Sequence, residues 1–216
     1  MKGLTKIFIG LVLSLFLVVP AFAIPIIDFG TGQAGAGGTV TVSGGNIVGT
    51  NIFIDSLTVA GAALNNGNYN LTGAAGPTAA TDLDGTAAAL NFDTSTKVFT
   101  IVGGVPGLGI PDGTTLLSGT ITSFSFTQSN FSLVLNGQGF DEKSPLLMTA
   151  LGETNTEFFF DGFSISGNTS GGGSPYIATS TDFLNVGKVP EPMSLILLGS
   201  GLAGAGLYRR LRKPRG

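Results

Sequence analysis

The sequence of 216 residues contains no cysteine, no histidine and no tryptophan. Without cysteine there is no disulfide framework, so a folded domain must be held by packing and backbone hydrogen bonds. Without histidine and cysteine, the common catalytic triads, His or Cys zinc sites and thiol redox chemistry are excluded. Carboxylates, hydroxyls and lysines are the groups that remain for chemistry.

Positive charge is scarce in the central part of the chain. Residues 24–188 hold three lysines against twelve carboxylates, a net charge near −9. Nucleic acid is therefore not expected as a partner, because phosphate backbones require clustered Lys and Arg. Neutral glycans and cations stay open as ligands. The composition is unusual in other respects as well, with 35 glycines, 16 phenylalanines and only 11% charged residues.

The chain begins with a segment typical of a secretory signal peptide, which we predict at residues 1–23. Lys2 and Lys6 supply the positive start, an apolar core follows, and Ala21 and Ala23 form the small-x-small site, so cleavage is expected after Ala23. An uncleaved anchor helix is the alternative, but an apolar core of about 13 residues is shorter than the ~20 that span a bilayer.

Residues 24–188 are predicted to form one β-rich exported domain. Short runs of alternating apolar and polar residues are separated by Gly, Asn and Asp, which is typical of strands and turns, and helical periodicity is not evident. The expected strands are GTVTVSG (38–44), TNIFIDSLTVAG (50–61), LNFDTSTKVFTIVG (90–103), GTITSFSF (119–126), FSLVLNGQGF (131–140), PLLMTALG (145–152), TEFFFDGFSISG (156–167) and DFLNVG (182–187).

Two of these runs predict an antiparallel meander with a defined turn. The faces expected to alternate are Thr122, Phe124 and Phe126 in one run, and Phe131, Leu133 and Leu135 in the other. Asn136-Gly137 predicts a strand reversal, because both central residues of a type I′ turn need positive φ. Eight or so such strands favour an all-β antiparallel sandwich or jelly-roll-like fold over a parallel α/β fold.

The best metal-site candidate in the sequence is weak. In TDLDGT, Asp82 and Asp84 precede Gly85 and resemble a fragment of a calcium loop, which needs several oxygen ligands around a tight turn. Only two of the usual carboxylates are present, so a plain Asp-Gly turn is favoured. We expect no metal and no cofactor.

Three enzyme motifs are considered and rejected. Asp93 and Asp112 lie in Asp-Thr and Asp-Gly-Thr stretches that could suggest a carboxylate dyad, but the glycines are misplaced and turn residues are favoured. The glycine-rich stretch 103–113 leads into Pro111 and a strand instead of a phosphate-binding helix. GFSIS (162–166) lacks the second glycine of a nucleophile elbow. The chain is therefore predicted not to be an enzyme.

The C-terminal tail, residues 189–216, has a three-part form. Residues 193–208 are uncharged and would rise about 24 Å as a helix, slightly less than the ~30 Å hydrocarbon core of a bilayer. The cations that follow can snorkel and place the C-terminus in the cytoplasm, with the body outside; they are Arg209, Arg210, Arg212, Lys213 and Arg215. Pro190 and Pro192 keep Glu191 on extended backbone just outside the span, where an enzyme can reach it.

In order and spacing, VPEP (189–192), the apolar span (193–208) and the basic end (209–216) resemble the PEP-CTERM sorting signal of Gram-negative bacteria. The resemblance covers the tail only. It implies processing by an integral-membrane exosortase and delivery of the body to the cell surface or an exopolysaccharide matrix. It makes Pro190, Glu191 and Pro192 the recognition motif, and the basic cluster the stop. Met193, where small residues are frequent, departs slightly from the pattern. A generic C-terminal anchor is the alternative.

These observations leave three hypotheses for the body of the chain. The first is a non-catalytic structural or adhesive protein of the cell envelope. The second is a surface module that binds glycan, with or without calcium, or another ligand such as ice. Threonine pairs at 39–41 and 120–122 raise the ice idea, but one or two pairs do not make a regular array, and Thr is simply a good strand residue. The third is a hydrolase that uses carboxylates alone.

Overall fold

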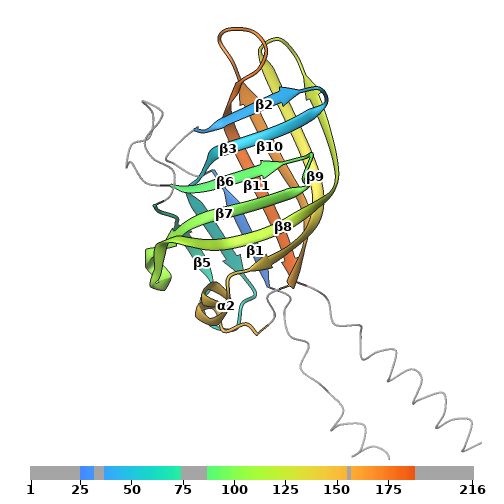
Figure 1. Ribbon diagram of the computed structural model, residues 1–216. Coiled ribbons are helices and arrows are strands. Elements are labelled where there is room, and N and C mark those ends of the chain that lie inside the picture. Colours follow the sequence, from blue (N-terminus) through green and yellow to red (C-terminus); the bar gives the residue numbers. More distant parts are fainter. Residues whose placement is uncertain (1–24, 32–36, 74–86, 155–156, 188–216) are drawn as a thin grey trace, which may run out of the picture.

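The computed structural model describes residues 25–31, 37–73, 87–154 and 157–187 (Figure 1). Most of these residues lie in strands. The elements are β1 (Ile26–Gly30), β2 (Thr39–Ser43), β3 (Asn46–Ile54), β4 (Ser56–Ala60), β5 (Gly67–Asn70), β6 (Ala88–Asp93), β7 (Val98–Val105), the 3₁₀ turn η1 (Pro106–Leu108), β8 (Ile110–Gln128), β9 (Ser132–Lys143), the helix α2 (Pro145–Leu151), β10 (Glu157–Asn168) and β11 (Tyr176–Gly187).

Eight antiparallel strands close into a barrel. Their order around the wall is β10-β9-β8-β7-β6-β3-β2-β11, and β11 pairs again with β10. The pairing of β2 with β11 that closes the barrel is short and consists of Val40 opposite Tyr176 and Thr39 opposite Ile177. In Figure 1, β9, β10 and β11 stand upright along one side, and β2, β3, β6 and β7 cross the other side at a steep angle. The long strand β8 first runs beside β7 and then turns upward beside β9.

A second branch of the sheet leaves the wall at β11. The lower part of β11 pairs with β1, which pairs with β4, which pairs with β5. β3 and β4 are nearly continuous and change partners around Asp55. A bridge between Thr72 and Gly104 then connects the end of this branch to β7, through N–H to O distances of 3.0 and 2.7 Å.

The all-β antiparallel prediction is confirmed, and the sandwich or jelly-roll arrangement is corrected to a closed barrel. A sandwich requires two separate sheets facing each other. Here β11 is hydrogen-bonded on one edge to β10 and on the other to β1 and β2, so the first and last strands of the chain join one continuous wall.

The predicted turn at Asn136-Gly137 is wrong. Both residues lie within β9, opposite Ser125 and Phe124 of β8. Gly137 faces the barrel interior, where a Cβ atom would overlap the ring of Phe163. The glycine therefore makes room for an aromatic ring, and the reversal occurs earlier, where the Ser129 N–H donates to the Ser132 carbonyl at 2.8 Å.

The PLLMTALG stretch, expected as a strand, is the short helix α2. It begins with Pro145 in its first turn and ends at Gly152, which has φ 77° and donates its N–H to the Met148 and Thr149 carbonyls. Seven residues are too few for helical periodicity to be distinct from an apolar strand. The helix buries Leu147, Met148 and Leu151 at one end of the barrel (Figure 1).

Two other expected strands are each divided in two. The 50–61 run bends at Asp55 into the end of β3 and all of β4. The 90–103 run is a hairpin, β6–β7, whose turn is closed by Asp93: its carboxylate accepts from the Ser95 N–H at 2.7 Å and from the Ser95 hydroxyl at 2.6 Å.

Candidate functional site

Four phenylalanine rings contact one another in a row inside the barrel, and the two central rings are stacked. Phe163 and Phe183 are register partners on β10 and β11, with ring centroids 4.9 Å apart and an interplanar angle of 8°. Phe92 lies 6.1 Å from Phe163, and Phe99 lies 5.4 Å from Phe183. All four rings are buried. A polar group placed in such an interior is costly unless it finds a partner within the protein.

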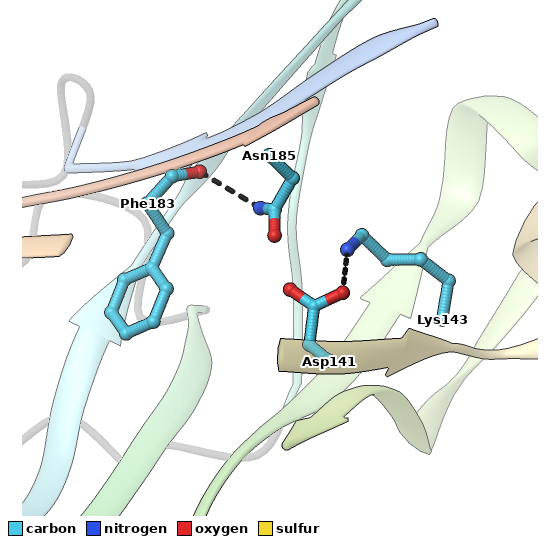
Figure 2. A network of polar contacts seen from close by, with 4 residues as sticks. All are labelled: Asp141, Lys143, Phe183 and Asn185. Atoms are coloured by element: carbon cyan, nitrogen blue, oxygen red, sulfur yellow. Dashed lines mark hydrogen bonds and ion pairs between the residues drawn. The ribbon is translucent and has the colours of Figure 1, made fainter. Parts of the chain in front are cut away.

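Polar side chains nevertheless lie inside the described part of the barrel, and three of them form a cluster. Along β9, every second residue from Leu133 onward is buried, and this inward row ends in Asp141 and Lys143. Asn185 of β11 is fully buried as well, and the Asp141 and Lys143 side chains have no exposed surface. Figure 2 shows the Lys143 amine, the Asp141 carboxylate and the Asn185 carboxamide pointing toward one another.

The hydrogen bonds of this polar cluster, Asp141, Lys143 and Asn185, are incomplete. Lys143 Nζ forms an ion pair with Asp141 Oδ1, and Asn185 Nδ2 donates to the Phe183 carbonyl at 3.0 Å. Asp141 Oδ2 and Asn185 Oδ1 are buried acceptors without a donor. Buried polar atoms are nearly always paired in native proteins, so two orphans side by side require a chemical explanation.

Burial works against the charges of the ion pair. It raises the pKa of the Asp141 carboxyl, although the Lys143 ammonium opposes this effect. It lowers the pKa of Lys143 to about 8, although Asp141 opposes that effect too. For both partners the loss of hydration outweighs their mutual attraction. Burial thus lowers the free-energy cost of moving a proton from the amine to the carboxylate.

A polar groove of about 690 Å³ lies on the outer face of β8–β11. Its lining is rich in hydroxyl and amide groups, with Ser123 and Ser125 from β8 and Asn136 and Gln138 from β9. Phe124 is the register partner of the inward-facing Gly137, so its ring lies on the opposite face of the sheet from the Ser123 and Ser125 side chains. The hydroxyl and amide groups of the outer face suit a polar ligand.

A carboxyl pair borders the same groove. Asp182 of β11 lines it, and Asp28 of β1 lies opposite Leu184, two residues further along β11. Burial, a hydrogen bond with Asp182 and the charge of Asp182 raise the pKa of Asp28 to about 6. Asp28 therefore holds its proton to a higher pH than an exposed aspartate does.

The two carboxylates predicted to be turn residues, Asp93 and Asp112, lie in hydrogen-bonded positions of their own. Asp93 closes the β6–β7 turn, and its hydrogen bonds with Ser95 hold its pKa below the usual value. Asp112 lies near the start of β8 and accepts a hydrogen bond from the Thr72 hydroxyl. Asp93 is a turn residue as predicted, whereas Asp112 lies within β8 near the other end of β7, so the two do not form a dyad.

The other predicted site residues lie outside the described residues. These are the cleavage-site residues Ala21 and Ala23, the weak metal candidates Asp82 and Asp84, the motif Pro190, Glu191 and Pro192, and the basic cluster Arg209, Arg210, Arg212 and Lys213. Within the described ranges, no group of three or more metal-ligating side chains comes together. The helices in these ranges are too short to cross a bilayer, and the predicted span at 193–208 lies beyond them.

Sequence reasoning missed the buried polar cluster. A signal was present, because the alternation through Leu133 and Leu135 continues at every second residue to Asp141 and Lys143. Reading Asn136-Gly137 as a turn interrupted that alternation. Asn185 carries no comparable signal, because its inward direction depends on the pairing of β11 with strands at the other end of the chain.

The described chain is a closed antiparallel β-barrel whose last strand, β11, ends at Gly187. The next residue begins a recognised signal: residues 188–213 match the PEP-CTERM protein-sorting motif. The resemblance of the tail is thereby confirmed, over the tail only. Signals of this kind are processed by exosortase, a membrane enzyme, and imply export and sorting to the cell surface. No curated protein and no solved structure matches the chain.

Proposed function

We propose that this chain is a non-catalytic structural or adhesive protein of the bacterial cell surface or exopolysaccharide matrix, and that the barrel is the cargo of its sorting tail. One observation carries the proposal: the last strand of the barrel ends at Gly187 and the sorting motif starts at residue 188. The tail therefore has the whole folded barrel directly upstream as the part to be delivered.

The proposed route follows from the order of the segments. The signal peptide directs export, and the span at 193–208 holds the precursor in the inner membrane with the basic cluster on the cytoplasmic side. The extended Pro190-Glu191-Pro192 peptide is then exposed outside the membrane, where an exosortase-type enzyme acts on it. Release or transfer of the barrel follows.

Replacement of Glu191 tests this route. In a plain anchor, Glu191→Ala is harmless or favourable, since a carboxylate beside a span adds to the cost of insertion. An enzyme that reads the carboxylate loses a charged contact, which typically costs a few kcal/mol of recognition. We expect Glu191→Ala to leave full-length precursor in the inner membrane, measured by immunoblot of membrane and surface fractions in the native host.

The matched control is Met193→Ala, which puts a small residue at the adjacent position and leaves the motif intact. We expect this variant to be processed as the wild type is. Normal processing of Glu191→Ala, or a wild-type protein that keeps its basic end, contradicts the sorting route and reduces the tail to an anchor.

A second candidate function, glycan binding, is favoured by the outer groove. Hydroxyl and amide side chains on this face, Asn136 among them, offer hydrogen bonds for a neutral sugar. We expect the purified protein to bind the host's exopolysaccharide, and Asn136→Ala to weaken binding several-fold. Phe131→Ala is the control, because Phe131 is 63% exposed and does not line the groove. Equal loss in both variants argues against the groove.

A further inference from the structure

The two orphan acceptors of the buried polar cluster can be satisfied by a single proton. Asp141 Oδ2 and Asn185 Oδ1 are both acceptors without a donor. A proton placed on Asp141 Oδ2 turns that atom into a donor, and Figure 2 shows this oxygen on the side of the carboxylate that faces Asn185. One hydrogen bond from the carboxylic acid to the carboxamide oxygen then satisfies both atoms.

The proton for this arrangement is already in the cluster. Lys143 Nζ is bonded to Asp141 Oδ1, and transfer of one proton within this pair gives a neutral amine and a neutral carboxylic acid. Burial shifts the equilibrium toward that state, because it raises the pKa of Asp141 and lowers that of Lys143. The same state is also reactive: the amine becomes a nucleophile, and the acid polarises the carboxamide.

We propose that Lys143 and Asn185 form an intramolecular isopeptide bond, with Asp141 as the proton donor and acceptor. The lone pair of Lys143 Nζ attacks Cγ of Asn185 while the acid of Asp141 donates to Oδ1. The tetrahedral intermediate returns that proton, and the amine's proton is passed through Asp141 to Nδ2. The Cγ–Nδ2 bond breaks and ammonia leaves, so the sum is amine plus carboxamide to amide plus ammonia. No oxidant, metal or cofactor is required.

The bond links two strands, β9 and β11, that do not pair with each other through backbone hydrogen bonds. Lys143 ends β9 and Asn185 lies near the end of β11, with β10 between them in the wall. The reacting groups meet only across the interior, so the reaction requires the folded barrel. The chain thereby gains a covalent cross-link although it contains no cysteine.

Mass spectrometry of the full chain, isolated from its host, tests the proposal. Cleavage after glutamate separates a segment that begins at Lys143 and ends at Glu153 from one that begins at Phe158. We expect these two segments to be recovered as one branched species, lighter than their sum by about 17 Da, the mass of the ammonia lost. Recovery of both segments separately at full mass from the wild type overturns the proposal.

Three variants assign the roles of the residues. Asn185→Ala removes the electrophile, and Asp141→Ala keeps amine and carboxamide but removes the proton donor, so both are expected to yield separate segments. Lys97→Arg, which changes a lysine outside the cluster, is expected to keep the branched species. Native β-structure in Asp141→Ala is checked by circular dichroism, and a linked product in this folded variant overturns the role of Asp141. If Asp141→Ala does not fold, the wild-type mass alone decides whether the bond exists.

Discussion

At the scale of single residues, three glycines of this barrel act by being small. Gly49, Gly119 and Gly137 each lie where a Cβ atom would overlap a phenylalanine ring, those of Phe92, Phe99 and Phe163 respectively. The rings fill the space that a side chain would occupy. At these three positions the glycine and the phenylalanine belong together, since each ring packs against a strand that has no side chain at that point.

Gly137→Ala tests this packing. The backbone at Gly137 is not in the left-handed region, so the expected loss comes from overlap with the Phe163 ring and amounts to about 1–3 kcal/mol of unfolding free energy. Gly162→Ala is the control, because its Cβ would meet only the Gly137 carbonyl oxygen, at 3.8 Å. Urea unfolding measures both. Equal stability of the two variants contradicts the packing role.

Asp28 predicts a pH dependence of stability. Its pKa is about 6 in the folded protein, above the ordinary 3.8, so the folded state holds the proton more tightly. The stabilisation is fully present below pH 3.8 and is lost as the pH rises through about 6. We expect the Tm of the wild type to fall by a few degrees from pH 4 to pH 7, and that of Asp28→Asn to fall less.

Asp93→Asn serves as the comparison, because the contribution of Asp93 to stability changes with pH in the opposite direction to that of Asp28. The pKa of Asp93 is lowered by its bonds with Ser95, so its contribution is present at neutral pH and is lost on acidification. If Asp28→Asn follows the wild-type profile between pH 4 and 7, the raised pKa of Asp28 is not a feature of the folded protein.

At the scale of elements, alternation predicts strands well and their ends poorly. The runs around Phe99, Leu135 and Ile165 are strands as expected, because a half-buried strand leaves a period of two in the sequence. The bend at Asp55, the helix at 145–151 and the uninterrupted passage of β9 through Asn136-Gly137 were not predicted. In each case tertiary packing decides between local options that the sequence leaves nearly equal in energy.

The helix α2 provides a test at this scale. Met148 is 1% exposed and packs into the end of the barrel, so Met148→Ala is expected to cost about 2–5 kcal/mol of unfolding free energy. Leu146 lies on the same helix but is 56% exposed, and Leu146→Ala is expected to change stability by no more than about 0.5 kcal/mol. A similar cost for both, measured in urea, means that the helix does not close the core.

At the scale of the whole molecule, the barrel joins the two ends of the exported domain. Ile26 of β1 is the register partner of Val186 of β11, so residues near both boundaries of the domain meet in one strand pair. Such non-local pairing is slow to form, because a long loop must close before its contacts contribute. The wall can be completed only when β11, which ends directly before the sorting motif, is available for pairing.

The proposed Lys143–Asn185 bond belongs to this scale as well. It closes a loop of about 40 residues, for which the chain-entropy model of cross-links gives a stabilisation of about 4 kcal/mol. That amount is comparable to a large part of the stability of an ordinary domain. An exported domain with no disulfides would gain from it outside the cell, where refolding assistance is scarce.

The strand that leads to the tail also determines how the protein responds to mechanical load. If the tail or its processed end is fixed to a surface, tension enters the barrel at Gly187 and runs along the axis of β11. The hydrogen bonds of β11 to β10, over ten register pairs, and to β1, over five, lie across that axis, so they resist in shear and must break together. A covalent link at Asn185, two residues from the point of loading, would pass the force to β9 before the hydrogen bonds beyond it bear any tension.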